Sequence, residues 1–173
     1  FRKELAGFFS SPIAYLIMGV FLLCTSSVLW IFPDYSILNS GYANLANFFT
    51  LSPYIFLLLI PAVCMRSLAE ERKEGTLDLL LSRPISTLHI VIAKYLAILA
   101  IVCLSLLPTL VYMYSVYNLG APKGNLDGGA IIGSYIGLVF LSACFAALGV
   151  FASSITKSQV NALVLAVLGS LFF

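Results

Sequence analysis

The stretch Arg66–Ser86, RSLAEERKEGTLDLLLSRPIS, separates two apolar parts of the chain and constrains how both must fold. It contains eight charged residues, half of the 16 in the chain (9 Lys and Arg plus 7 Asp and Glu). The sequences on either side of it are mostly apolar. Charges gathered between two hydrophobic segments belong in water, because charged side chains are costly inside a bilayer. We therefore interpret this stretch as a water-exposed element that is available to a partner protein.

The composition indicates a polytopic membrane protein. Hydrophobic residues make up 61% of the 173 residues, charged residues make up 9%, and the mean hydropathy is +1.07. A soluble domain carries about 25% charged residues. With so few charges this chain could not cover a water-exposed surface, so we expect an all-α protein with several membrane spans.

Five apolar segments are predicted to cross the membrane, each needing about 20 residues. Their predicted limits are 13–32, 48–65, 88–114, 129–153 and a fifth that starts near residue 160. Prolines inside the second and third segments predict kinks, which membrane helices tolerate; they are Pro53, Pro61 and Pro108. Lys94 lies in the first two turns of the third segment, where its side chain can extend back to the interface.

The ends of the chain carry two further expectations. Residues 1–12, FRKELAGFFSSP, place Leu5, Phe8 and Phe9 on one helical face, which is typical of a helix lying in the membrane interface. A polar start of the first span is the alternative. The chain begins at Phe1 and stops inside an apolar run at Phe173, so we expect it to be part of a longer protein whose fifth span continues.

The charged stretch is predicted to form a bent, two-piece amphipathic element. Ser67 and Glu70 have the spacing of a capping box, and a helix over 68–74 would end at Gly75. Thr76 would cap a second short helix, which Pro84 stops. Leu77, Leu80 and Leu81 fall on one face of that second helix. The alternative is a solvated loop whose charges only set the topology.

The distribution of basic residues predicts the orientation. Alternating spans place the N-terminus, the charged stretch and the loop around residue 157 on one side of the membrane. By the positive-inside rule that side is the cytoplasm. The opposite side has only Lys123, whereas the cytoplasmic side has Arg2, Lys3, Arg66, Arg72, Lys73, Arg83, Lys94 and Lys157.

Small residues recur along the fourth predicted span. Gly129, Gly133 and Gly137 repeat every fourth residue, a spacing that lets helix backbones approach closely. The glycines would pack either against another helix of the same chain or against a second subunit. Small polar residues in the spans would either line a path or bond across helices; they are Thr25, Ser26, Ser27, Thr50, Ser52, Ser105 and Ser142.

The sequence contains no motif for chemistry of its own. It has no G-x-x-x-x-G-K-[ST] phosphate loop, and no acidic residue, Arg or His at mid-membrane depth. The four cysteines lie in four different apolar segments, without metal-ligand spacing. We expect no catalytic, cofactor-binding or metal-binding residues here, and energy for any work would have to enter from outside.

The charged stretch also resembles a known family. Glu71, Gly75, Thr76, Leu80, Leu81, Pro84 and Ser86 read E-x-x-x-G-T-x-x-x-L-L-x-x-P-x-S, with Lys94 downstream. This pattern is similar to that of ABC-2-type ABC transporter permeases. Four pieces also resemble the gliding-motility permeases of Bacteroidetes, the GldF family: FFSSPIAYL (8–16), FLLLIPAVCMRSLAEERKEGTLDLLLSRPIS (56–86), LLPTLVYMYS (106–115) and IGSYIGLVFL (132–141).

The resemblance implies a fold and partners. It implies a single permease domain over residues 1–173, of the type V exporter kind, with six spans of which about five are present. It implies an interfacial N-terminal helix and a cytoplasmic coupling helix in the inner membrane. ATP and Mg would be bound by a separate ATP-binding subunit (GldA-like), and a second permease subunit (GldG-like) or an identical copy would complete the core. Membrane lipid is also an expected partner, and nucleic acid is not.

The resemblance also implies roles for residues. The coupling helix would contact the ATPase through Glu70, Glu71, Arg72, Lys73 and Glu74, and Leu77, Leu80 and Leu81 would hold it against the spans. Two alternatives stay open. One is a membrane scaffold or anchor of a motility or secretion machine without a substrate path. The other is a self-contained membrane enzyme or secondary carrier, which the lack of ionisable groups inside the spans disfavours.

Overall fold

The computed structural model describes residues 7, 12–32, 45–65, 67, 87–120, 126–156 and 158–172. Every regular element in these ranges is an α-helix, which confirms the predicted all-α fold class for this part of the chain. The elements are α2 (Pro12–Trp30), α3 (Ala46–Cys64), α6 (Thr87–Leu106), α7 (Leu110–Leu119), α8 (Gly128–Ile155) and α9 (Gln159–Leu171).

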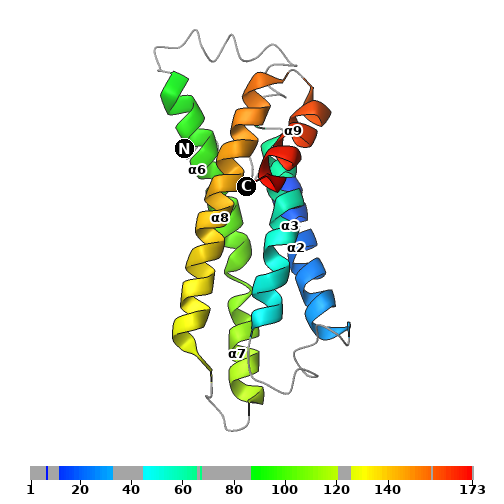
Figure 1. Cartoon of the computed structure of the whole chain (residues 1–173), viewed down its shortest axis with the longest axis vertical. Helices are drawn as coiled ribbons and strands as arrows, with labels where there is room; N and C mark the ends of the chain where they lie inside the picture. The colour runs from blue at the N-terminus through cyan, green and yellow to red at the C-terminus, as the bar shows by residue number, and fades with distance from the viewer. Residues whose placement is uncertain are drawn as a thin grey trace.

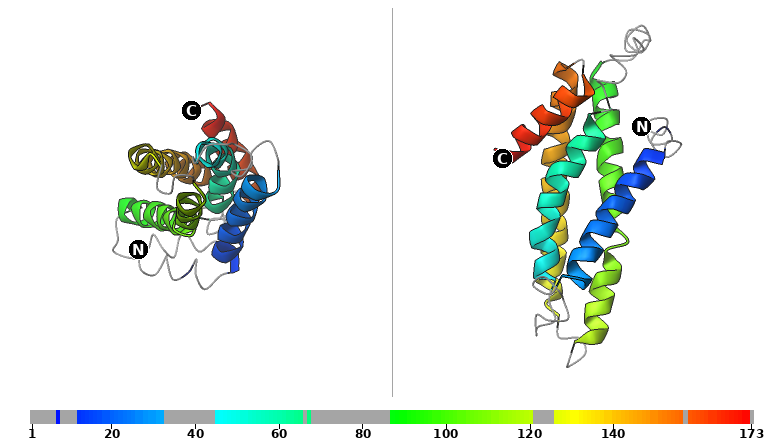
Figure 2. Two further views of the ribbon diagram at one scale, coloured as in Figure 1. Left: turned by 90° about the horizontal axis from the view of Figure 1, so that it is seen from below. Right: turned by 90° about the vertical axis from the view of Figure 1, so that its right-hand side faces the viewer.

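The helices form an elongated bundle whose members alternate in direction (Figure 1). α2, α3, the pair α6–α7, and α8 run along the long axis, and α9 turns back from the end of α8. The second view in Figure 2 shows α9 crossing obliquely beside α3 and α8, and it contacts both. α3 is central, since it contacts α2, α6, α8 and α9.

Within the residues that the structure describes, three helical segments are long and apolar enough to cross a membrane: Ala46–Cys64, Thr87–Leu119 and Gly128–Ile155. The apolar stretches Ala14–Trp30 and Gln159–Leu171 are shorter than the other three. The predicted limits of the second and fourth spans agree with the structure to within two residues at each end. The third span, predicted to end at residue 114, continues to Leu119.

The prolines of the second and third predicted spans have different effects on the helices. Pro53 and Pro61 lie inside α3, which continues past both. Pro108 lies in a turn between α6 and α7, so the kink predicted there is confirmed as a break in the helix. Proline causes such breaks because it lacks an N–H and its ring clashes with the carbonyl four residues earlier.

Tight packing joins α3 to α2 and α8. The rings of Phe21 and Phe56 stack with their centroids 5.0 Å apart. At the other end of α3, Cys64 is fully buried against Gly149 of α8. Large apolar side chains on the outer surface remain exposed, including Leu23, Tyr54 and Phe140 at 69–71%. That distribution suits a bundle whose surroundings are lipid rather than water.

Candidate functional site

The predicted coupling residues, from Glu70 to Ser86, lie outside the residues that the structure describes. The two helices that flank them are described. α3 ends and α6 begins at the same end of the bundle, where α8 also ends (Figure 1). The structure therefore brings the two attachment points of the charged stretch to one end of the bundle.

Ser67 differs from its predicted role as a helix cap. Its backbone N–H donates to the carbonyl of Cys64 at 2.9 Å, directly after the end of α3. Its hydroxyl is buried and has no hydrogen-bond partner in the described structure. The Ser67 hydroxyl therefore does not make the capping bond that was predicted, and Glu70, the other residue of the predicted capping box, lies outside the described residues.

Lys94 lies near the start of α6, as predicted. The sequence did not show which side of the helix it occupies. In the structure Lys94 lies two turns into α6 and is 3% exposed, so it faces the interior of the bundle. His89, one turn nearer the start of α6, is exposed as expected for an interfacial residue.

The glycine repeat of α8 is not a packing surface within the described part of the chain. Gly129, Gly133 and Gly137 are all exposed. A Cβ at Gly133 or Gly137 would meet no atom within 4 Å, and one at Gly129 would meet only Asp127 at 3.5 Å. The close approach occurs instead at Gly149, which the sequence analysis did not single out. The interface with a second subunit stays a prediction.

A polar cluster lies on the inner side of α7. The hydroxyl of Tyr112 lies 2.5 Å from Ser26 Oγ and 3.3 Å from Thr25 Oγ1, both on α2. Thr25 already donates to the carbonyl of Phe21 at 2.9 Å. A hydroxyl has one proton to donate, so Thr25 acts only as an acceptor toward Tyr112, whereas either hydroxyl of the Ser26–Tyr112 contact can be the donor. Together these contacts join Tyr112 of α7 to α2.

A second hydroxyl contact holds the break between α6 and α7. Thr109 is fully buried and its hydroxyl donates to the carbonyl of Leu106 at 2.6 Å. Tyr135 of α8 lies 3.1 Å from the same Thr109 oxygen. Because the Thr109 proton is already engaged, Tyr135 is the donor. α8 therefore bonds directly to the residue that ends the turn.

Aromatic rings from α3 connect the two contacts. Phe48 is fully buried and its ring centroid lies 5.8 Å from that of Tyr112 and 6.0 Å from that of Tyr135. Phe49 meets Tyr135 edge to face at 5.1 Å. Aromatic pairs at such distances and angles are favourable beyond the area they bury. We call Thr25, Ser26, Phe48, Thr109, Tyr112 and Tyr135 the tyrosine cluster.

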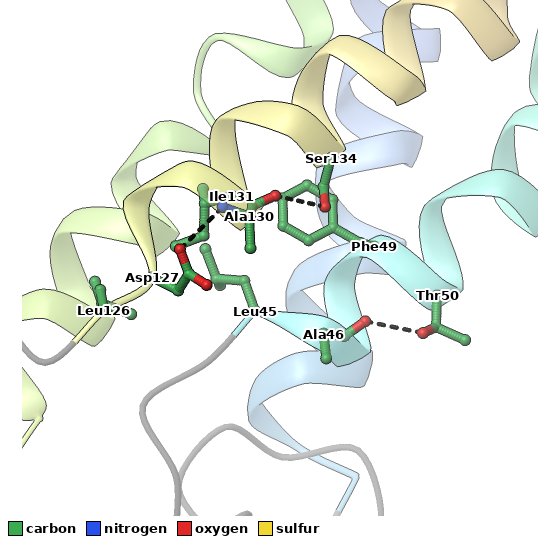
Figure 3. Close-up of a pocket in the computed structure, with 9 residues that line it drawn as sticks. All are labelled: Leu45, Ala46, Phe49, Thr50, Leu126, Asp127, Ala130, Ile131 and Ser134. Atoms are coloured by element: carbon green, nitrogen blue, oxygen red, sulfur yellow. Dashed lines mark hydrogen bonds between the residues drawn. The ribbon is translucent and has the colours of Figure 1, made fainter.

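A cavity of about 420 Å³ lies next to the tyrosine cluster, between α3 and the start of α8 (Figure 3). Apolar residues make up much of its wall, and Asp127 supplies a carboxylate that caps α8 by accepting from the Ala130 N–H at 3.1 Å. The two hydroxyls in the wall donate within their own helices, Thr50 to Ala46 and Ser134 to Ala130. This arrangement can hold an apolar group but contains no catalytic pair. The lining residues are Leu45, Ala46, Phe49, Thr50, Leu126, Asp127, Ala130, Ile131 and Ser134.

Three further small polar residues of the spans bond within their own helices. Ser52, Ser105 and Ser142 are buried and donate to Phe48, Ile101 and Val139. Thr25 and Ser26 instead bond across helices, to Tyr112, as one of the two sequence-based alternatives expected. Within the described ranges, no group of three His, Cys, Asp or Glu side chains could hold a metal ion.

Comparison with known proteins identifies the family. No curated protein and no solved structure matches the chain. Residues 34–173 match the sequence profile of the ABC-2 family transporter protein, and this range includes the charged stretch and all described helices from α3 onward. The chain therefore belongs to the ABC-2 family of transporter proteins, as a multi-pass membrane permease component of an ABC transporter.

Proposed function

We propose that this permease couples ATP hydrolysis by a separate subunit to export, and that the segment from Glu70 to Ser86 is the coupling element. The observation that carries the proposal is the position of this segment. It joins the end of α3 to the start of α6, and both of these lie toward the same end of the bundle (Figure 1). The sequence also contains no phosphate-binding loop, so ATP and Mg would be bound by the partner.

The coupling element would act as a lever between the ATPase and the spans. Closure of the ATP-binding subunits would push on Glu71 and its charged neighbours Glu70, Arg72, Lys73 and Glu74. Gly75 and Thr76 would form the bend, and Pro84 and Ser86 would end the element at the start of α6. Leu77, Leu80 and Leu81 would keep its apolar face against the bundle. A push on this element would reach α3 and α6 directly, because both are its attachment points.

The orientation follows from the basic residues. The end of the bundle where α3 ends and α6 begins would face the cytoplasm of a cell whose inner membrane holds the protein. The N-terminus would lie on the same side. Residues 1–173 would then form one part of a six-span permease domain of the type V exporter kind.

The system that this permease serves would be gliding motility. The proposal rests on the four sequence pieces that resemble the GldF family. The ATP-binding partner would be GldA-like, and the second permease subunit would be GldG-like or an identical copy. The exposed glycines of α8, with open space around Gly133 and Gly137, leave a surface on which that second permease could pack.

Charge reversal at Glu71 tests the coupling role. The variant Glu71→Lys should accumulate in the membrane normally but fail to stimulate the ATPase activity of the partner subunit. A matched control is Asp34→Lys, which reverses a charge in the loop predicted to lie on the opposite side. If Glu71→Lys stimulated the ATPase as well as the unmodified permease does, the coupling role of Glu71 would be wrong.

A further inference from the structure

The backbone between α6 and α7 has the form of a hinge. Leu107, Pro108 and Thr109 form a turn, and successive N–H groups bond to the carbonyl three residues earlier: Thr109 to Leu106, Leu110 to Leu107, Val111 to Pro108 and Tyr112 to Thr109, at 2.9–3.1 Å. A tight three-residue pattern inside a long helix often marks a hinge. The break divides the long segment Thr87–Leu119 into two rigid pieces.

α7 is lightly attached to the rest of the bundle. Of its ten residues, only Tyr112 and Val116 are buried. Several of its other large side chains face outward, with Val111 61%, Tyr114 70% and Leu119 59% exposed. Tyr112 and Val116 are one turn apart, and the partly buried Met113 also packs against the core, so one stripe of three side chains holds the helix. An element with so few buried contacts opens at low free-energy cost.

Two tyrosine hydroxyls make contacts between helices at the break between α6 and α7. Tyr112 bonds α7 to Thr25 and Ser26 of α2, and Tyr135 bonds α8 to Thr109 at the turn itself. Both rings pack against Phe48 of α3. These contacts therefore connect residues 107–109 and the start of α7 to α2, α3 and α8. Further along α7, Val116 is the only other buried residue.

We propose that α7 is a hinged arm that swings about Leu107–Thr109, and that the Tyr112 and Tyr135 hydroxyls hold it closed. In the closed position Val116 is 1% exposed. In the open position Tyr112 leaves α2 and Val116 becomes accessible. This conformational equilibrium belongs to the permease itself and does not depend on the coupling proposal.

Thiol labelling of Val116→Cys measures the open population. The experiment uses the full-length permease in native membranes, with the exposed or half-buried cysteines Cys24, Cys103 and Cys144 replaced by Ala. Cys64 is retained because it is fully buried. N-ethylmaleimide should react slowly with the introduced thiol, at a rate set by transient opening. Tyr112→Phe keeps the ring and removes the hydroxyl, so it should raise the labelling rate about threefold, the effect of one average interhelical hydrogen bond.

Variants at the turn separate a hinge from simple fraying of α7. Tyr135→Phe and Thr109→Val remove the contact at the turn without touching Val116, and each should also raise the rate about threefold. Thr109→Ser keeps the hydroxyl and should restore slow labelling. Tyr114→Phe is the matched control, since its side chain is 70% exposed, and should leave the rate unchanged.

The outcome that overturns the proposal is specific. If the introduced thiol is labelled at the same rate in the Val116→Cys protein and in its Tyr135→Phe and Thr109→Val variants, the contact at Thr109 does not control the opening of α7. If that thiol is labelled at once in the parent protein, no closed state exists. If Tyr112→Phe fails to accumulate, the Tyr135 and Thr109 variants decide the question by themselves.

Discussion

A Cβ atom on Gly149 of α8 would lie 2.5 Å from the Sγ of Cys64 at the end of α3, and 2.6 Å from its Cβ. Real atoms do not approach so closely, so only glycine fits there. Cys64 Sγ also lies 3.8 Å from the carbonyl of Ala146, at the distance of a weak hydrogen bond. Gly149 and Cys64 thus fix how closely α3 and α8 approach next to the charged stretch.

Gly149→Ala should destabilise the permease. The added methyl must push α3 away from α8, and overpacking of this kind costs about 1–3 kcal/mol. The better helix propensity of Ala offsets only about 0.5–1 kcal/mol of that cost. Thermal unfolding of the purified protein in detergent should therefore show a lower midpoint.

Gly133→Ala is the matched control on the same helix. A Cβ at Gly133 meets nothing within 4 Å, so only the gain in helix propensity should act. Its unfolding midpoint should equal or exceed that of the unmodified protein. Equal midpoints for Gly149→Ala and the unmodified protein would contradict the close approach of α3 and α8.

Phe21→Ala should cost about 3 kcal/mol or more, because it removes a buried ring and leaves a cavity beside Phe56. Phe21 is 1% exposed and stacks on Phe56 at 5.0 Å. Phe140→Ala removes the same ring from a position that is 69% exposed, so it should change stability little. Unfolding by denaturant in one detergent compares the two. Similar losses for both variants would show that the α2–α3 contact is not a packing core.

The sequence predicted the helices well because their limits depend on local features. The apolar runs, the loop glycines and Pro108 placed the ends of α3 and α8 within two residues and located the break after α6. Each of these signals acts over a few residues of backbone. The charged stretch was likewise sufficient to suggest the family that residues 34–173 match.

The sequence could not show which face of each helix is buried. In lipid both the interior and the surroundings are apolar, so hydrophobic periodicity carries little information. Gly133 and Gly149 are both glycines of α8, yet Gly133 is exposed and Gly149 packs against Cys64. Tyr112, Tyr114 and Tyr117 lie close together in sequence, but of these only Tyr112 faces α2. These differences depend on where the neighbouring helices lie.

Cysteine labelling from the two sides of the membrane should establish the orientation. In a protein with Cys24, Cys103 and Cys144 replaced by Ala, Lys123→Cys should react with a membrane-impermeant thiol reagent added to intact cells. Lys157→Cys should react only after the membrane is opened. The expectation follows from the bias of basic residues toward one side. If Lys157→Cys reacted in intact cells, the proposed orientation would be wrong.

A bulky residue in the glycine repeat of α8 should separate the subunits without unfolding the chain. Gly137→Leu adds a side chain into open space, so the unfolding midpoint of the single chain should change by no more than about a degree or two. If Gly137 packs against a second permease, the variant should elute as a smaller species in size-exclusion chromatography. The control is Ile136→Ala, because the Ile136 side chain is 52% exposed. The neighbouring Leu138 is buried and is therefore unsuitable as a control. If Gly137→Leu elutes as the same oligomer as the unmodified protein, the glycine face of α8 is not part of the subunit interface.

Co-purification tests the central claim, that this chain is a permease coupled to a separate ATPase, most directly. The full-length protein, extracted from its native membrane in mild detergent, should carry an ATP-binding subunit, and the complex should hydrolyse ATP. The variant Glu71→Lys should lose that subunit or its stimulated activity, while Asp34→Lys keeps both. A permease that purifies with membrane partners but without any ATP-binding subunit would contradict the claim and would favour a scaffold role instead.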